Sequence, residues 1–379
     1  MSRKPCIVMS LVLALSLGLA ACAPATKAPN TPVAAATTVP AAAPATQAPS
    51  ATAVDPVQQM KDAVKAEGTI ISYGLPDDWV NYGALWKIYE SRYGITHKDT
   101  DMSSGEILAA LRAEKSKPVA DITDLGINFA KVINDEGLSM PYKNRYWDEI
   151  PDYAKDPDGR WSAAYWGAIA FTVNTDIVKN VPQTWDDLLK PEYRDMVCMK
   201  DPRESATANM VVLAAAYAHG GSETNVQPGL DFFKKMKANG ILRSIAPSTS
   251  AIQKGEAPIS LFWDFDGLSA KKNLGMRNLA VVIPKDGSVA GLYVQFITAG
   301  APHPNAAKAM IELEYSDEGQ LAYANGFVHP IRTSVQLPPA LQAEFPPADA
   351  YRSVAFPKNY VALTAAATAI SDGWTLISQ

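Results

Sequence analysis

Apolar and polar positions follow two different periods along the chain after residue 55. Short runs rich in β-branched residues predict strands, and segments with apolar residues three or four positions apart predict helices. The strands are expected at 69–73, 95–99 and 120–125, and the helices at 60–67, 82–92, 106–117 and 129–136. Strands that alternate with helices form βαβ units, so this region predicts an α/β fold with a parallel sheet.

The second half of the chain repeats this alternation around longer apolar runs. Strands are expected at 161–174, 196–200, 257–266 and 279–288, and helices at 208–218, 230–237, 306–314 and 361–377. The chain beyond residue 55 is long enough for two lobes around two cores. In open α/β sheets, ligands bind beyond the carboxyl ends of the strands, where helix N-termini point free N–H groups. Polar residues that follow strands are therefore the candidates for a binding site.

The first 54 residues predict a targeting signal and a spacer rather than part of the folded domain. A positively charged start and an apolar run precede Leu19-Ala-Ala-Cys22, in which small residues come before a cysteine. This pattern predicts a signal peptide over 1–21 and a lipidated Cys22; an ordinary signal peptide with an accidental cysteine is the alternative. Residues 22–54 are mostly Ala, Pro and Thr, a composition that cannot bury enough apolar surface to fold. We expect a disordered tether there.

Charge and cysteine content narrow the class of protein. The formal charge of −5 comes with no basic stripe, which argues against a nucleic-acid partner. Beyond the leader and Cys22 the only thiol is Cys198. One thiol cannot form an internal disulfide, and no CxxC metal or redox motif exists. Cys198 lies in an apolar run and is expected to be a small buried hydrophobe.

The stretch from Ala257 to Arg332 carries the most specific pattern in the chain. Its motifs are Ala257-Pro-Ile-Ser-Leu-Phe-Trp-Asp-Phe-Asp266, Leu279-Ala-Val-Val-Ile-Pro-Lys-Asp-Gly-Ser288, Ala301-Pro-His-Pro-Asn-Ala-Ala307, Tyr315-Ser-Asp-Glu-Gly-Gln320 and His329-Pro-Ile-Arg332. This order resembles the C-terminal half of the extracellular solute-binding proteins of bacterial ABC importers. The nearest likeness is to the iron(III)/thiamine/polyamine/phosphonate-type group, and it extends over roughly Asp55 to Arg332.

The resemblance implies a two-lobe, periplasmic-binding-protein-like (type II) fold, in which crossover strands form a hinge and closure traps a solute. It places lobe 1 at 55–165, lobe 2 at 166–267, a return to lobe 1 at 268–320 and a C-terminal helical segment at 321–379. It also implies a monomer outside the cytoplasm, in the periplasm or on the outer face of the cell membrane. The expected partners are a small-molecule solute and a membrane permease with its ATPase, and the membrane would be reached by the lipid anchor.

In the first lobe, the candidate ligand-binding residues follow two predicted strands. Asp77, Asp78 and Trp79 come directly after the first strand and could supply a carboxylate pair with an aromatic wall. Two solvated turn aspartates and a packed tryptophan are the alternative. Ser103 and Ser104 stand at a helix start, where they offer hydroxyl and N–H groups or serve as an ordinary N-cap.

The second lobe and the crossing strands supply further candidates. Ser205 and Thr207 belong to an Asp-Pro-x-x-Ser-x-Thr loop that commonly touches ligand in the family that the chain resembles. Trp166 lies on the first crossing strand, where hinge packing is the alternative. Tyr293 resembles a ligand position of the family, with sheet packing as its alternative.

The cluster Trp263-Asp-Phe-Asp266 is the sharpest of these candidates. Strand alternation predicts Trp263 and Phe265 on one face of the chain, and Asp264 and Asp266 on the other. Two acids on one face of a buried strand are costly without a cation or hydrogen-bond donors. The cluster therefore predicts a site for a positively charged group. Acids in solvent, or paired with nearby lysines, are the alternative.

No catalytic, metal or cofactor motif is present. The chain has no HExxH, phosphate-binding glycine loop or nucleophile elbow, and its four histidines are scattered. The acids beside Trp79, Trp166 and Trp263 favour an organic amine or polyamine as the solute, because aromatic faces attract ammonium groups. An aminophosphonate, a phosphorylated compound, thiamine and iron(III) stay open, although the chain lacks the paired tyrosines typical of iron binding in this group. A sensor-linked binding module without a transporter is a further alternative.

Overall fold

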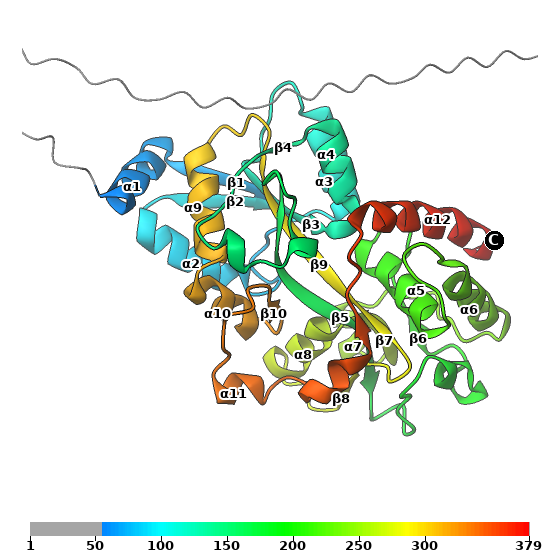
Figure 1. Ribbon diagram of the computed structural model, residues 1–379. Coiled ribbons are helices and arrows are strands. Elements are labelled where there is room, and N and C mark those ends of the chain that lie inside the picture. The colour runs from blue at the N-terminus through cyan, green and yellow to red at the C-terminus, as the bar shows by residue number, and fades with distance from the viewer. Residues whose placement is uncertain (1–54, 379) are drawn as a thin grey trace, which may run out of the picture. The chain divides into compact units, whose positions relative to one another are not determined.

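The computed structural model describes residues 55–378 (Figure 1). Its main sheet has the strand order β2-β1-β3-β9-β5-β7-β6. The strands on this path are β1 (Thr69–Tyr73), β2 (Thr96–Thr100), β3 (Ile122–Gly126), β5 (Ser162–Asn174), β6 (Val197–Cys198), β7 (Ile259–Trp263) and β9 (Ser288–Thr298). The short strands β4 (Ser139–Met140), β8 (Leu279–Val282), β10 (His329–Pro330) and β11 (Val354–Ala355) pair along β5 and β9.

Two long strands connect two sets of short ones. β1 pairs parallel with β2 and β3, whereas β6 pairs parallel with β7. Between these sets, β9 runs antiparallel to β3 at one end and to the first half of β5, whose second half pairs with β7 and β8. The predicted α/β class is confirmed, and the long apolar stretch expected at 161–174 is β5.

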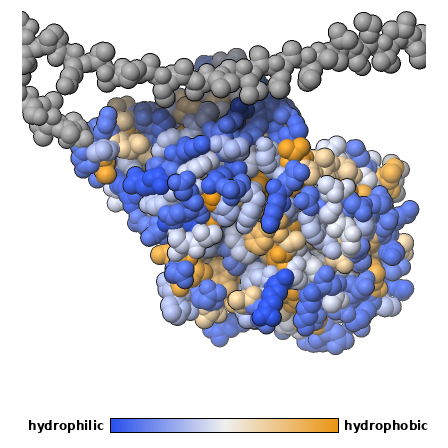
Figure 2. Space-filling model, viewed as in Figure 1, coloured by the Kyte–Doolittle hydropathy of each residue, from blue (hydrophilic) through white to orange (hydrophobic). Residues whose placement is uncertain are grey.

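Helices cover each set of strands. Their bounds are α1 (Pro56–Glu67), α2 (Tyr82–Tyr93), α3 (Ser104–Ala113), α4 (Ala130–Glu136), α5 (Ala206–Ala218), α6 (Gln227–Ala238), α7 (Thr249–Gln253), α8 (Asp264–Asn273), α9 (Pro304–Glu314), α10 (Asp317–Asn325), α11 (Pro339–Gln342) and α12 (Tyr360–Ser378). In Figure 1, α1, α2 and α9 lie on the β1–β3 side, and α5, α6 and α8 lie on the β6–β8 side. In the same view, apolar residues gather near the middle of the surface between largely hydrophilic margins (Figure 2).

The last helix contacts both groups of helices. Thr364 of α12 donates to the backbone carbonyl of Asn128 beside β3 (2.7 Å), and the Asn209 amide of α5 donates to the carbonyl of Ala367 (3.2 Å). Farther along, Trp374 packs edge-on against Phe233 of α6. The helix expected at 361–377 therefore connects the two lobes.

The strand expected over 257–266 is shorter than predicted. β7 ends at Trp263, and α8 begins at Asp264. Acidic residues in a first turn suit the positive end of a helix, which explains the early start. The prediction that Asp264 and Asp266 share one strand face is therefore wrong, because two residues two positions apart lie on nearly opposite sides of a helix.

Strand pairing also bears on the lobe boundaries. β8 pairs with the same half of β5 as β7 does, so residues 268–287 contain strand structure of the second set. We therefore propose that the return crossing is β9, beginning at Ser288, rather than a crossing at 268. The expected leader at 1–21 and tether at 22–54 lie outside the described residues.

Candidate functional site

The loops that follow β3 and precede α5 meet over the crossing strands. A cleft there is lined by Gly126, Ile127, Asn128, Ala206, Met210, Trp263, Gly291, Leu292 and Tyr293. A Cβ atom on Gly126 would lie 3.1 Å from that of Ala206, so the two lobes approach closely at this point. The centre of the cleft is too narrow for a water molecule because side chains fill it.

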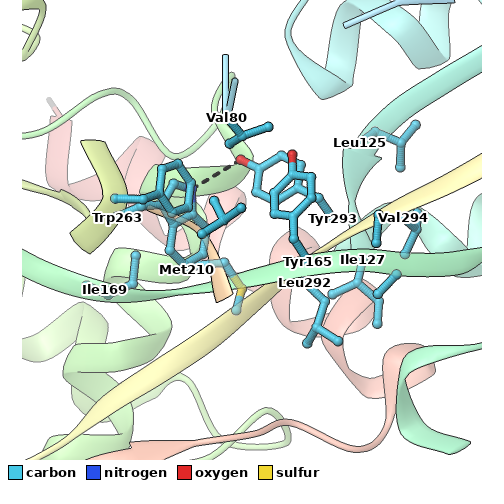
Figure 3. Close-up of a cluster of buried hydrophobic side chains, with 14 of the residues drawn as sticks. Val80, Leu125, Ile127, Tyr165, Ile169, Met210, Trp263, Leu292, Tyr293 and Val294 are labelled. Carbon is cyan, nitrogen blue, oxygen red and sulfur yellow. Dashed lines mark hydrogen bonds between the residues drawn. The ribbon is translucent and has the colours of Figure 1, made fainter. Parts of the chain in front are cut away.

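Trp263 and Tyr293 of this lining belong to a cluster of five packed aromatic residues, which we call the aromatic floor: Trp79, Tyr165, Trp263, Phe265 and Tyr293. Trp79 meets Phe265 and Tyr293 edge-on, with ring centroids 5.4 and 5.5 Å apart. Tyr165 stacks on Tyr293 at 5.4 Å. Trp263 donates its indole N–H to the Tyr293 hydroxyl (3.1 Å), a bond drawn in Figure 3. Residues from both lobes and both crossing strands are thus held in one packed unit.

Two glycines make room for the floor. Gly167 of β5 and Gly291 of β9 are register partners across the crossing strands. A Cβ on Gly167 would lie 2.4 Å from the Phe265 ring, and one on Gly291 would lie 1.8 Å from the Trp263 ring. Both separations are far below van der Waals contact, so only glycine fits while the rings stay in place.

Asp124, in the middle of β3, is the carboxylate beneath the floor. Its Oδ2 accepts from the hydroxyls of Tyr165 (2.6 Å) and Tyr82 (3.2 Å) and from the Trp79 indole N–H (3.3 Å). Its Oδ1 has no hydrogen-bond partner among the described residues, although the residue is buried, with only 4% of its surface exposed. Burial raises the pKa of Asp124 to about 7, against the lowering effect of these donors.

A second buried acid lies behind Asp124. The Tyr323 hydroxyl is 3.2 Å from that of Tyr82 and 3.0 Å from Glu314 Oε1. Burial raises the pKa of Glu314 well above its ordinary value. Tyr323 and Tyr82 therefore connect Glu314 to the carboxylate of Asp124 through hydrogen bonds. The raised pKa favours the protonated form of Glu314.

The start of α5 presents a different chemistry to the same cleft. Ser205 caps the helix by accepting from the N–H of Ala208, and first-turn N–H groups have no partner within a helix. The Thr207 hydroxyl lies 3.3 Å from that of Tyr293. Lys200, at the end of β6, is exposed and opposes the rise in the pKa of Asp266, which burial brings to about 7. Asp266 itself is half-buried.

Two of the expected site residues lie in the hinge instead. Asp264 is fully buried and accepts from the Ala168 N–H (2.9 Å), the Tyr351 hydroxyl (2.8 Å) and His329 Nε2 (3.2 Å). Trp166 stacks on His329, with centroids 3.9 Å apart. Neither side chain belongs to the aromatic floor, because Asp264 starts a helix and Trp166 faces oppositely to Tyr165 along β5.

The first-lobe candidates divide in the same way. Trp79 joins the aromatic floor, and the buried Ser104 hydroxyl accepts from the Gly126 N–H beside the cleft (3.2 Å). Ser103 is engaged with Glu106 in a capping box, which is the ordinary N-cap alternative. Asp77 is exposed and faces His97 of β2 at 3.6 Å, and Asp78 is also exposed.

Sequence analysis missed Asp124, Phe265 and Lys200 as site residues. Asp124 sits inside a predicted strand, where period-2 patterning gives no sign that its partners lie about 40 residues away on either side. Phe265 was assigned only to a strand face. Lys200 lies two residues after the end of β6, but the predicted strand at 196–200 included it, so the rule that selected Asp77 and Ser205 passed it over.

Other features limit the chemistry of the described residues. Within residues 55–378, no three His, Cys, Asp or Glu side chains come together as a metal site. Cys198 is buried and free, and burial raises the pKa of its thiol to about 11. The helices of this region include none with the length and apolarity needed to span a membrane.

A two-lobe α/β fold with loops and helix starts meeting over crossing strands defines a binding protein that encloses a small solute. Residues 117–356, nearly two thirds of the chain, match the family model described as bacterial extracellular solute-binding protein. The chain belongs to that family, whose members are binding proteins of ABC transporters that act outside the cytoplasm with a permease and an ATPase. The resemblance to extracellular solute-binding proteins that the sequence indicated is confirmed.

Of three related sequences, two are named as periplasmic binding proteins, and these two differ in the solute. An uncharacterized protein of Haemophilus influenzae is 30% identical over 254 residues, which are 63% of this chain and 71% of the relative. A putative 2-aminoethylphosphonate-binding periplasmic protein of Salmonella typhimurium is 22% identical over 260 residues, or 67% and 75% of the two chains. A spermidine/putrescine-binding periplasmic protein of the same organism is 26% identical over 161 residues, or 41% and 45%.

Solved structures show the fold. The periplasmic binding protein AfuA from Actinobacillus pleuropneumoniae, with fructose-6-phosphate bound, gives a TM-score of 0.69 at 22% identity and covers 81% of this chain and 97% of its own. Iron-bound HitA from Pseudomonas aeruginosa gives 0.67 at 17% identity, over 82% and 99%. The predicted two-lobe architecture is therefore confirmed.

Proposed function

We propose that this solute-binding protein captures a small zwitterion that carries an ammonium group and a phosphonate or phosphate group. The ammonium group would face the aromatic floor and its carboxylates. The anionic group would face the start of α5. Both kinds of chemistry were weighed from the sequence, and the arrangement of the cleft favours a solute that uses both.

One contact carries this proposal. The 3.3 Å approach of the Thr207 and Tyr293 hydroxyls joins the start of α5 to the floor above Asp124. First-turn N–H groups and the helix dipole attract an anion. Aromatic faces and carboxylates attract an ammonium group. The two environments are one side-chain contact apart, which suits a compact solute with opposite charges at its ends.

The acid count also supports a zwitterion over a polyamine. Of the four aspartates that favoured an amine, Asp264 is satisfied in the hinge, and Asp77 and Asp78 are exposed away from the floor. Asp266 stays close to the cleft, and Asp124 joins it. The relative named for 2-aminoethylphosphonate is consistent with this choice, and the relative named for spermidine and putrescine keeps a simple amine as the second candidate.

A melting experiment on refolded protein separates these candidates. We expect 2-aminoethylphosphonate to raise the melting temperature more than either ethylphosphonate or propylammonium does. Ethylphosphonate carries only the anionic group, and propylammonium carries only the cationic group. A ligand at about a hundred times its Kd adds about 2.7 kcal/mol of stability. Thr207→Val should reduce the shift, and the exposed Thr368→Val should not. A larger shift with putrescine than with the zwitterion would favour the polyamine, and no shift with any phosphonate would refute the proposal.

We also propose that Cys22 is lipidated and that residues 22–54 tether a monomeric binding protein to the outer face of a membrane. The support is the Leu-Ala-Ala-Cys pattern and the Ala/Pro/Thr composition that follows it. Cys22→Ala should move the protein from the membrane fraction to the soluble fraction and abolish labelling by a fatty-acid analogue. Unchanged membrane retention would contradict the anchor.

A further inference from the structure

The indole N–H of Trp79 occupies a polar position in an otherwise aromatic cluster. Its Nε1 lies 2.9 Å from the Tyr165 hydroxyl and 3.3 Å from Asp124 Oδ2. Tyr165 donates its own proton to the same Oδ2 at 2.6 Å, so its oxygen accepts from the indole. A neutral donor thus fills a position where two acceptors converge, and such a position suits a cation better, since charge-assisted hydrogen bonds are stronger.

Asp124 retains capacity for another donor. Its Oδ1 has no partner among the described residues, and its side chain is almost fully buried. The Gln295 side chain, on the register partner of Asp124 in β9, lies close enough to lower the pKa of this carboxyl group but makes no hydrogen bond to Oδ1. Buried acceptors are nearly always satisfied, so Oδ1 can accept a further donor, such as one from a bound solute. An ammonium group carries three donors, so it can serve Oδ2 and the Tyr165 hydroxyl, as the indole N–H does, and still has a donor to spare.

The surroundings of this position also suit an ammonium group. The rings of Phe265 and Tyr293 contact that of Trp79, with centroids 5.4 and 5.5 Å away, so an ion that replaced the indole would have aromatic neighbours. Ammonium ions within about 6 Å of aromatic faces are attracted by the ring quadrupole.

The backbone next to Trp79 is strained. Val80 and Asn81 have φ values of +42° and +69°, and a β-branched residue rarely adopts the left-handed region. The Asn81 amide donates to the carbonyl of Ala322 (2.7 Å), which holds the turn against α10. Strain of this kind clusters at functional sites, where the surrounding structure holds it in place.

We propose that Asp124 and Tyr165 form an ammonium subsite and that the Trp79 indole N–H is its internal occupant. The ammonium group of the solute replaces the indole on Asp124, and the ring of Trp79 turns aside to form a wall of the filled site. The identity of the natural solute rests on the proposed function, whereas the subsite itself does not.

A cavity-rescue experiment tests the subsite without the natural solute. In the full chain, Trp79→Ala removes the occupant, and propylammonium is then added at about ten times its Kd. We expect its melting temperature to rise by at least about 2 °C. The neutral isostere 1-propanol should give a much smaller rise. Trp79→Phe, which keeps a ring but removes the N–H, provides a second variant that disturbs packing less and should also respond to propylammonium.

Two controls make the result specific. The double variant Trp79→Ala with Asp124→Asn should lose the preference for propylammonium over propanol. Trp374→Ala opens a cavity against Phe233 of α6, far from Asp124 in the chain, and should show no such preference. Equal rescue by propanol, or a preference that survives Asp124→Asn, would overturn the proposal. Failure of every phosphonate in the melting panel would refute the zwitterion but leave this result unaffected.

Discussion

Two buried aspartates, Asp124 and Asp264, have similar surroundings but differ in how many of their carboxylate oxygens accept hydrogen bonds. Each accepts from a tyrosine hydroxyl and is almost fully buried. Asp264, in the hinge, uses both of its oxygens, with partners from β5, β10 and the C-terminal segment. Asp124, in the cleft, has three donors on one oxygen and none among the described residues on the other. The presence of hydrogen-bond donors on both carboxylate oxygens, rather than burial or residue type, distinguishes the structural acid from the candidate for binding.

The largest expected effect is on the hinge acid. Asp264→Ala would leave the N–H of Ala168, the Tyr351 hydroxyl and His329 without their acceptor. Each buried group left unpaired costs about 1–3 kcal/mol, so we expect a loss of at least about 3 kcal/mol in the free energy of unfolding. Denaturant unfolding measures it, with the exposed Asp349→Ala as the matched control. A loss below about 1 kcal/mol would mean that the hinge network is not structural.

The cleft acid should be detected through pH. The folded-state pKa of Asp124, about 7, lies above its unfolded value of about 4. Its contribution to stability is therefore fully present below about pH 4 and is lost as pH rises through about 7. The loss is about 1.4 kcal/mol per pH unit within that window.

The test is the free energy of unfolding at pH 5, 6 and 7 for the wild type and Asp124→Asn. Asp266 and Glu314, whose pKa values are also raised, act in the same direction in both proteins, so only the difference between the slopes reports Asp124. The variant should show a flatter decline. Parallel slopes would show that Asp124 is not titrating in this range.

A smaller effect is expected where the floor rests on the crossing strands. Gly291→Ala places a methyl group against the Trp263 ring, and overpacking of this kind costs about 1–3 kcal/mol. Because the ring must shift, solute affinity should fall as well, and Gly291→Ala with Trp263→Phe should recover part of both losses. Gly105→Ala, with no atom within 4 Å of the added carbon, is the control. If the double variant recovers neither stability nor affinity, the loss in Gly291→Ala does not come from contact with the Trp263 ring.

Local patterns predicted much of the fold and only part of the site. The class, the crossing strand at 161–174 and the Ser103 cap depend on neighbouring residues, and periodicity and capping chemistry are sufficient for them. The end of β7 depended on whether Asp264 starts a helix, which its distant partners at 168, 329 and 351 decide. The role of Asp124 rests on Trp79 and Tyr165, each more than 40 residues away, which no local pattern contains.

The measurement closest to the central claim is calorimetric titration of the wild type and Asp124→Asn with 2-aminoethylphosphonate and with ethylphosphonate. Losing a charge-assisted bond to the ammonium group should weaken zwitterion binding about tenfold or more, since such bonds contribute about 1.5–3 kcal/mol. Binding of ethylphosphonate, which has no ammonium group, should stay within about twofold. If Asp124→Asn binds the zwitterion as tightly as the wild type, or weakens both ligands equally, then Asp124 is not the ammonium partner.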